Sequence, residues 1–232
     1  MMMKIFSRWL HKGKRQSQGS HEFYLIQDRE QSPVAESFRA LCAAIRDVEA
    51  QGSAQAVLFT NANAGPGGAL VAVNAAALLA YAGNRVILVD CDLRTPVVHE
   101  FFKLKNIGLT NFVEDKVTQE EILQGSSIPN LKIVTSGPLP LEAVPVLSNS
   151  KVRTLLHYLR RQADYVFLTS SSLLIKSESI VSDACVLASK VDGVVLVLDS
   201  RCVKPQVAQK VVQLLQGAKA NIIGTVLHDV VE

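Results

Sequence analysis

The chain has 232 residues, of which 48% are hydrophobic and 19% charged, a composition typical of a folded globular protein and not of a disordered one. Its longest apolar stretch, Ala69 to Ala82, is interrupted by Asn74 and is shorter than the roughly 20 residues that a transmembrane helix needs. The net charge of +3 is uneven, because residues 1–15 hold five Lys/Arg and no acid. The near-neutral remainder excludes a whole-domain nucleic-acid-binding surface, so no nucleic-acid partner is expected.

Residues 1–32 are predicted to form a basic tail and linker, and residues 33–232 a single domain. As a helix, the start of the tail would place apolar side chains near one side with basic residues flanking them, as in an interfacial membrane anchor. The alternative is a tail that binds nothing. The residues of this candidate membrane or partner segment are Lys4, Phe6, Arg8, Trp9, Leu10 and Lys12.

Predicted helices and strands alternate after the tail. The predicted helices are 33–45, 69–81, 118–123 (with a Thr118–Glu121 capping box), 151–161, 179–189 and 205–215. The predicted strands are 56–59, 85–89, 131–134, 165–168, 194–198 and 221–227. This alternation predicts an α/β fold, a doubly wound, mostly parallel sheet with helices on both faces. Ligands of such sheets bind beyond the carboxyl ends of the strands, so functional residues are expected after the strands that end at Phe59, Val89 and Leu168.

The loop after the first of these strands is glycine-rich, with Gly65, Pro66, Gly67 and Gly68 leading into the 69–81 helix. A glycine-rich loop between a strand and a helix is the geometry of a phosphate-binding loop. A complete motif also needs a Lys for the phosphates and a Ser or Thr for Mg²⁺, and the loop has neither. Two interpretations remain: a tight turn without a ligand, or a weak nucleotide or anion site.

Polar residues follow two more strands. Asp90 and Asp92, after the 85–89 strand, are suited to holding a metal, or else they cap the turn and pair with Arg94. After the 165–168 strand, Thr169 precedes the serine run 170–172. These serines lack the G-x-S-x-G pattern, so no serine nucleophile is predicted. The four cysteines lack zinc-site spacing, and with turn capping favoured for Asp90 and Asp92 no metal site is predicted.

Five segments along the chain carry a family resemblance through their order and spacing: 33–41, 86–96, 137–140, 182–184 and 191–194. Each segment is weakly diagnostic alone, but their order and spacing together are strong evidence. In this order they resemble the bacterial tyrosine kinases (BY-kinases) of capsule and exopolysaccharide assembly. These kinases belong with the Min-type and Par-type ATPases, which carry a deviant Walker A loop, so the resemblance implies a P-loop NTPase-like fold.

The resemblance implies a degenerate active site. The family has its Walker A Lys six residues before the position of Asn74, which places Gly68 there and Ala69 at the Mg²⁺-ligand position. Thr169 stands where the family has its Walker B Asp. Each lost charge-assisted contact is worth about 1.5–3 kcal/mol, so Mg-ATP binding is predicted to be weaker by several orders of magnitude. No catalytic residue is therefore expected. The candidates for residual nucleotide contacts are Gly65, Gly67, Gly68, Ala69, Asp90, Asp92 and Arg94.

The helix from Pro33 is similar to the family's oligomerisation helix. Glu36 and Arg39 match the first two charged positions of its pattern, and Cys42 stands where the family has a second Arg. The pair could lie within one helix, worth a few tenths of a kcal/mol, or reach a neighbouring subunit. The family's C-terminal tyrosine cluster is missing, since the tyrosines are Tyr24, Tyr81, Tyr158 and Tyr165.

Together these features predict a non-catalytic, pseudokinase-type scaffold or regulator of surface-polysaccharide synthesis or export, with no cofactor. Its expected location is the cytoplasm, including the inner face of the cytoplasmic membrane. The implied partners are the cytoplasmic segment of a membrane polysaccharide co-polymerase, a catalytic relative, or a second copy. The main alternative is an active ATP-dependent tyrosine kinase or ATPase that uses Mg²⁺ with ATP or ADP and a Lys from elsewhere, such as Lys176. A Min-type or Par-type positioning protein is a third possibility.

Overall fold

The computed structural model describes residues 7–8, 33–48, 55–175, 179–180, 183–199 and 203–229. Eight strands form one sheet in the order β1-β10-β9-β2-β6-β3-β5-β4, and every neighbouring pair is parallel except β4 with β5. The strands are β1 (Ser7–Arg8), β2 (Gln55–Asn61), β3 (Val86–Cys91), β4 (Gln124–Gly125), β5 (Leu131–Val134), β6 (Tyr165–Ser170), β9 (Gly193–Asp199) and β10 (Ile222–Asp229). A separate antiparallel hairpin consists of β7 (Leu174–Ile175) and β8 (Ser179–Ile180).

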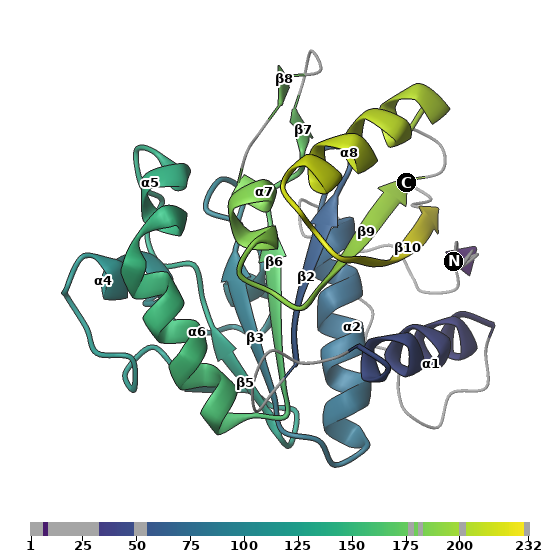
Figure 1. The fold of residues 1–232 in the computed structure, drawn as a ribbon. Helices are drawn as coiled ribbons and strands as arrows, with labels where there is room; N and C mark the ends of the chain where they lie inside the picture. Colours follow the sequence, from purple (N-terminus) through teal and green to yellow (C-terminus); the bar gives the residue numbers. More distant parts are fainter. Residues whose placement is uncertain are drawn as a thin grey trace, which may run out of the picture.

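Helices cover both faces of the sheet, as Figure 1 shows. One face carries α1 and α2, and the other carries α5, α6 and α7. The helices are α1 (Pro33–Arg46), α2 (Gly67–Tyr81), α3 (Val98–Phe101), α4 (Leu109–Val113), α5 (Ala143–Ser148), α6 (Ser150–Gln162), α7 (Asp183–Ala188) and α8 (Pro205–Gly217). The predicted doubly wound α/β class is therefore confirmed.

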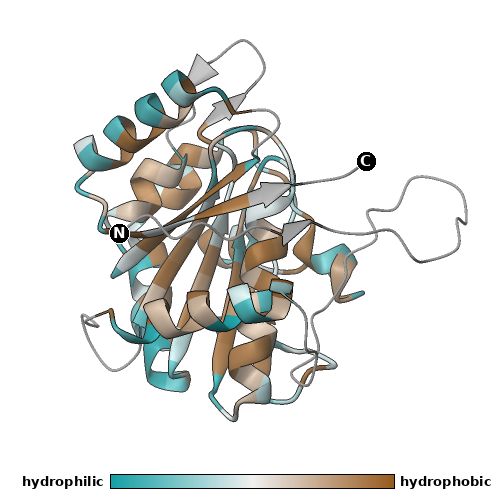
Figure 2. Ribbon diagram, turned by 90° about the vertical axis from the view of Figure 1, so that its right-hand side faces the viewer, coloured by the Kyte–Doolittle hydropathy of each residue, from teal (hydrophilic) through white to brown (hydrophobic). Residues whose placement is uncertain are grey.

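The central strands are buried on both faces because their side chains alternate between two hydrophobic clusters. In β2, Val57 and Phe59 pack in the cluster that contains α1 and α2, whereas Ala56 and Leu58 pack in the cluster under α5, α6 and α7. In Figure 2 the strands and the inner sides of the helices are hydrophobic, and the outer side of α8 is hydrophilic. This packing fixes the strand register and hence the positions of the strand ends.

The structure corrects the sequence-based elements at three places. Residues 118–123 form no helix, although the predicted capping-box bonds between Thr118 and Glu121 are both present. Helix α7 begins at Asp183, and the predicted start of that helix is instead strand β8. In the tail, Ser7–Arg8 form a strand parallel to β10, so the helical interpretation is wrong for these two residues. The other candidate tail residues, Lys4, Phe6, Trp9, Leu10 and Lys12, lie outside the described residues.

None of the described helices is both long and apolar enough to cross a membrane.

Candidate functional site

The three strand ends singled out in the sequence meet at one edge of the sheet. Strand β6 lies between β2 and β3, and all three are parallel, so their carboxyl ends point the same way. The glycine-rich loop follows β2, Asp90 lies near the end of β3, and Thr169 lies opposite it on β6. This carboxyl edge is where α/β sheets of this type bind their ligands.

The glycine-rich loop leads into α2 two residues earlier than predicted. Helix α2 begins at Gly67, with Pro66 as its N-cap, and no side chain caps it. The Asn61 side-chain amide donates a hydrogen bond of 2.7 Å to the Gly65 carbonyl inside the loop. Gly68 and Ala69, at the positions of the family's Lys and Mg²⁺ ligand, are both buried and supply neither an amine nor a hydroxyl.

Asp90 and Thr169 are joined by a buried hydrogen bond. The Thr169 hydroxyl donates to Asp90 Oδ1 at 2.8 Å, and the backbone N–H groups of Asp92 and Val98 donate to the same carboxylate at 3.1 and 3.2 Å. Burial, aided by the nearby Asp92 charge, raises the pKa of Asp90 to about 6 despite these bonds. Three donors from the protein therefore satisfy this carboxylate.

Asp92 caps the turn that follows β3. It accepts hydrogen bonds from the backbone N–H groups of Arg94 and Thr95 and from the Thr95 hydroxyl, at 2.9 to 3.0 Å. The turn-capping interpretation is thus what the structure describes for Asp92. Among the described residues, no group of three or more His, Cys, Asp or Glu side chains is arranged to hold a metal ion.

The Arg94 side chain pairs with Asp183 and not with Asp92, which corrects the predicted pairing. Its guanidinium contacts the fully buried Asp183 carboxylate through two bonds of 2.7 and 3.1 Å. The Ser171 hydroxyl donates to the same carboxylate at 2.7 Å, so one member of the serine run holds the start of α7. The hydrogen bonds to Asp183 raise the pKa of Arg94 and engage its guanidinium within the protein.

Helix α1 contains the predicted Glu36–Arg39 ion pair, with Nη1 and Oε2 3.0 Å apart within the helix. The interface role of this pair stays a prediction. Cys42, where the family has a second Arg, is buried and directs its thiol to the Ala75 carbonyl of α2 at 3.8 Å. Burial raises the pKa of the Cys42 thiol to about 12, so this side chain serves packing.

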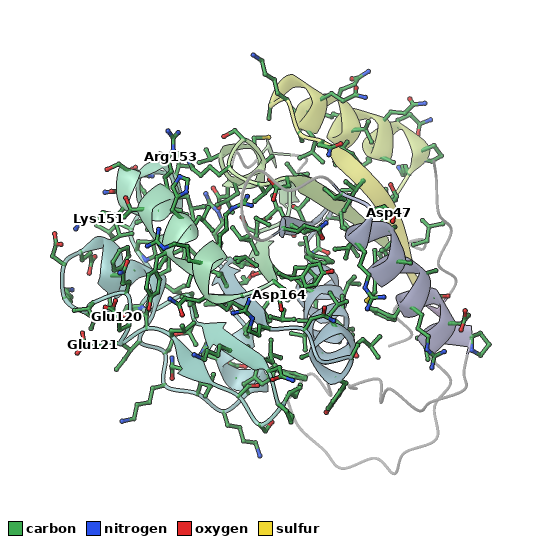
Figure 3. The ribbon with its side chains drawn as sticks, turned by 60° about the horizontal axis from the view of Figure 1, so that its bottom comes forward. Asp47, Glu120, Glu121, Lys151, Arg153 and Asp164 are labelled. Carbon is green, nitrogen blue, oxygen red and sulfur yellow. The ribbon has the colours of Figure 1, made fainter. Side chains whose placement is uncertain are left out.

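Charged side chains also lie on α6 and on a turn near it. Lys151 and Arg153 project from α6, and Glu120 and Glu121 from a nearby turn (Figure 3). Lys151 forms an ion pair with Asp115. The same turn borders a shallow hollow of about 490 Å³, which is lined by Phe112 and by residues 115–121 and is formed by none of the strand ends described above. Polar residues of its rim bond to one another, as Thr118 and Glu121 do, and we assign no chemistry to this hollow.

Two features of the site were not anticipated from the sequence. Asp183 was noted as part of a family-like segment, but its contact with Arg94 joins elements 89 residues apart in the chain. Asn61 follows the predicted strand 56–59, whereas in the structure it is the last residue of β2 and its side chain lies beside Gly68. A polar residue at the end of a buried strand was the available signal, because such a side chain needs a partner nearby.

The fold and the glycine-rich loop define the class of the P-loop NTPase-like proteins that includes the MinD ATPases. The MinD protein of Pyrococcus horikoshii in complex with Mg-ADP has a similar fold, with a TM-score of 0.61 over 75% of this chain and 70% of that one, at 18% identity. The chimerical protein CapA2B2 is more similar, with a TM-score of 0.78 over 87% of both chains and 25% identity.

Sequence comparison narrows this class. No family model matches the chain. The tyrosine-protein kinase YwqD of Bacillus subtilis is 30% identical over 84% of this chain and 80% of its own. The putative tyrosine-protein kinase CapB of Staphylococcus aureus is 28% identical over 88% of this chain and 87% of its own. The chain belongs to the bacterial tyrosine kinase (BY-kinase) family.

Proposed function

We propose that this protein is a non-catalytic, pseudokinase-type member of its family, acting as a scaffold or regulator in surface-polysaccharide synthesis or export. One observation carries the proposal: the buried Asp90 carboxylate accepts its hydrogen bond from Thr169, at the position where the family has a second carboxylate. Two facing carboxylates need a metal ion or a shared proton between them, whereas a carboxylate and a hydroxyl satisfy each other.

The residues around this bond do not fit Mg-ATP. Gly68 and Ala69 give no charge to the phosphates and no hydroxyl to the metal, and Arg94 is engaged with Asp183. Positioning and charge stabilisation are most of phosphoryl-transfer catalysis, so a site that lacks them is not expected to turn over. Asp90, Asp92 and the loop glycines remain candidates for a weak residual nucleotide contact only.

The partners follow from the family resemblance. The proposed partner is the cytoplasmic segment of a membrane polysaccharide co-polymerase, with a catalytic relative or a second copy as further possibilities. In this role the protein acts in the cytoplasm, at the inner face of the membrane. The tail and the Glu36–Arg39 pair on α1 are the candidate contact regions.

Calorimetric titration of Mg-ATP and Mg-ADP into the purified protein tests the proposal, with the Bacillus subtilis relative as the positive control. We expect no binding up to about 1 mM nucleotide, because several contacts of about 1.5–3 kcal/mol each are missing. Micromolar binding would refute the proposal and favour the alternative, an active tyrosine kinase that keeps Asp90 and recruits an amine. Its suggested donor, Lys176, lies outside the described residues.

A further inference from the structure

Asn61 is held beside the glycine-rich loop by one backbone and one side-chain hydrogen bond. Its backbone carbonyl accepts a hydrogen bond of 2.9 Å from the Leu173 N–H, while its side-chain amide donates to the Gly65 carbonyl at 2.7 Å. The residue is 7% exposed. A short side chain anchored in this way has little freedom to leave the loop.

The amide of Asn61 also fills the space next to Gly68. A Cβ atom at Gly68 would lie 3.2 Å from Nδ2 and Oδ1 of Asn61 and 3.3 Å from its Cγ. Such distances are tighter than ordinary contacts of a Cβ atom, so a side chain at position 68 would require Asn61 to shift by a few tenths of an ångström. Side chains in a helix tilt toward its N-terminus, so any side chain at position 68 would point back over the loop, into the Asn61 amide.

We propose that Asn61 occupies the space that a phosphate-binding side chain at position 68 would need, in addition to the loss of the charged residues. The inference rests on the proposed loss of nucleotide binding. It adds that the Asn61 side chain must be removed, besides restoring the missing Lys and hydroxyl, before the loop binds nucleotide. With the amide in place, the loop keeps its shape through a bond within the protein. A lysine at position 68 would have to push the Asn61 amide aside by at least a few tenths of an ångström.

Four proteins test this inference by calorimetric titration of Mg-ADP: the parent, G68K/A69T, N61A/G68K/A69T and N63A/G68K/A69T. Asn63 is the matched control, because it lies in the same loop but contributes none of the three atoms nearest to a Cβ at Gly68. We expect the variant with N61A to bind Mg-ADP at least tenfold more tightly than G68K/A69T, and the N63A variant to match G68K/A69T. Equal affinity of G68K/A69T and the N61A variant, with both folded by circular dichroism, would overturn the inference.

The outcome for the parent separates the two proposals. If the parent itself binds Mg-ADP at micromolar concentration, the proposed function fails, whereas the comparison between the N61A and N63A variants still decides the role of Asn61. Hydrogen exchange of the single variants gives a readout that needs no nucleotide. We expect the backbone N–H groups of residues 63–65, 67 and 68 to exchange at least fivefold faster in N61A than in the parent, and unchanged exchange would contradict the anchoring role.

Discussion

Replacing Thr169 with Asp, the residue of the family's Walker B motif, should destabilise the protein. The substitution removes the hydroxyl that donates to Asp90 at 2.8 Å and puts a second carboxylate beside one that is 0% exposed. Loss of a hydrogen bond to a charged acceptor costs about 1.5–3 kcal/mol. Two negative charges about 4 Å apart at an effective dielectric constant of about 20 repel by about 4 kcal/mol. Relaxation and proton uptake offset part of the sum, so we expect a loss of about 3–5 kcal/mol at pH 7.5.

Urea unfolding of the T169D variant at several pH values measures this effect. The folded variant retains a proton on the carboxylate pair that the unfolded chain releases near pH 4, so its stability should increase by up to about 1.4 kcal/mol per unit as pH falls from 7.5. Added Mg²⁺ should stabilise T169D and leave the parent unchanged. The T169S variant, which keeps the hydroxyl, is the control and should lose less than about 1 kcal/mol. A T169D variant as stable as T169S at pH 7.5 would refute the reasoning.

Three further outcomes are expected. The side-chain carboxyl ¹³C signal of Asp90 should titrate near pH 6 in the folded protein, and a midpoint near 4 would be inconsistent with its burial. The free energy of unfolding should fall as pH rises from about 4 to 6, because the raised pKa makes the folded state bind this proton more tightly than the unfolded chain does. In thermal or urea unfolding, Arg94→Ala should lower the free energy of unfolding by about 2 kcal/mol, because it leaves the buried Asp183 carboxylate without its ion-pair partner. Arg85→Ala breaks an exposed pair and should lower it by less than about 1 kcal/mol, and equal losses would contradict this distinction. Gly108→Ala should severely reduce soluble expression and the melting temperature, because its Cβ would lie 1.8 Å from the backbone carbonyl oxygen of Thr135, just after β5. A melting temperature near that of the parent would contradict this packing.

The α/β class and most long elements could be predicted because they depend on local pattern. The strand at 56–59 is a short apolar run and α1 has apolar side chains at helical spacing, and both survive in the structure with boundaries shifted by one or two residues. The short elements could not be predicted in this way. Helices α3, α4 and α5 have four to six residues and are held by tertiary contacts, which local propensity does not encode.

The candidate site was predictable in its residues and not in its contacts. The chain order places Asp90 and Thr169 at neighbouring strand ends, but the bond between them depends on the register of β3 with β6. The pairing of Arg94 was assigned to the nearest acids in the sequence, whereas the fold supplies Asp183 from the start of α7. Side chains at loop ends choose partners by geometry, which sequence spacing alone does not give.

The contacts at this edge share one physical feature, which fits the proposed loss of nucleotide binding. In an active P-loop protein, a buried carboxylate and an open loop carry an energetic penalty that the bound metal and nucleotide offset. Here hydroxyls of Thr169 and Ser171 satisfy the carboxylates of Asp90 and Asp183, and the Asn61 amide bonds within the loop. Each of these contacts makes the folded state less dependent on a bound ligand. A scaffold that must present one surface constantly benefits from such contacts, whereas a nucleotide-driven switch would be hindered by them.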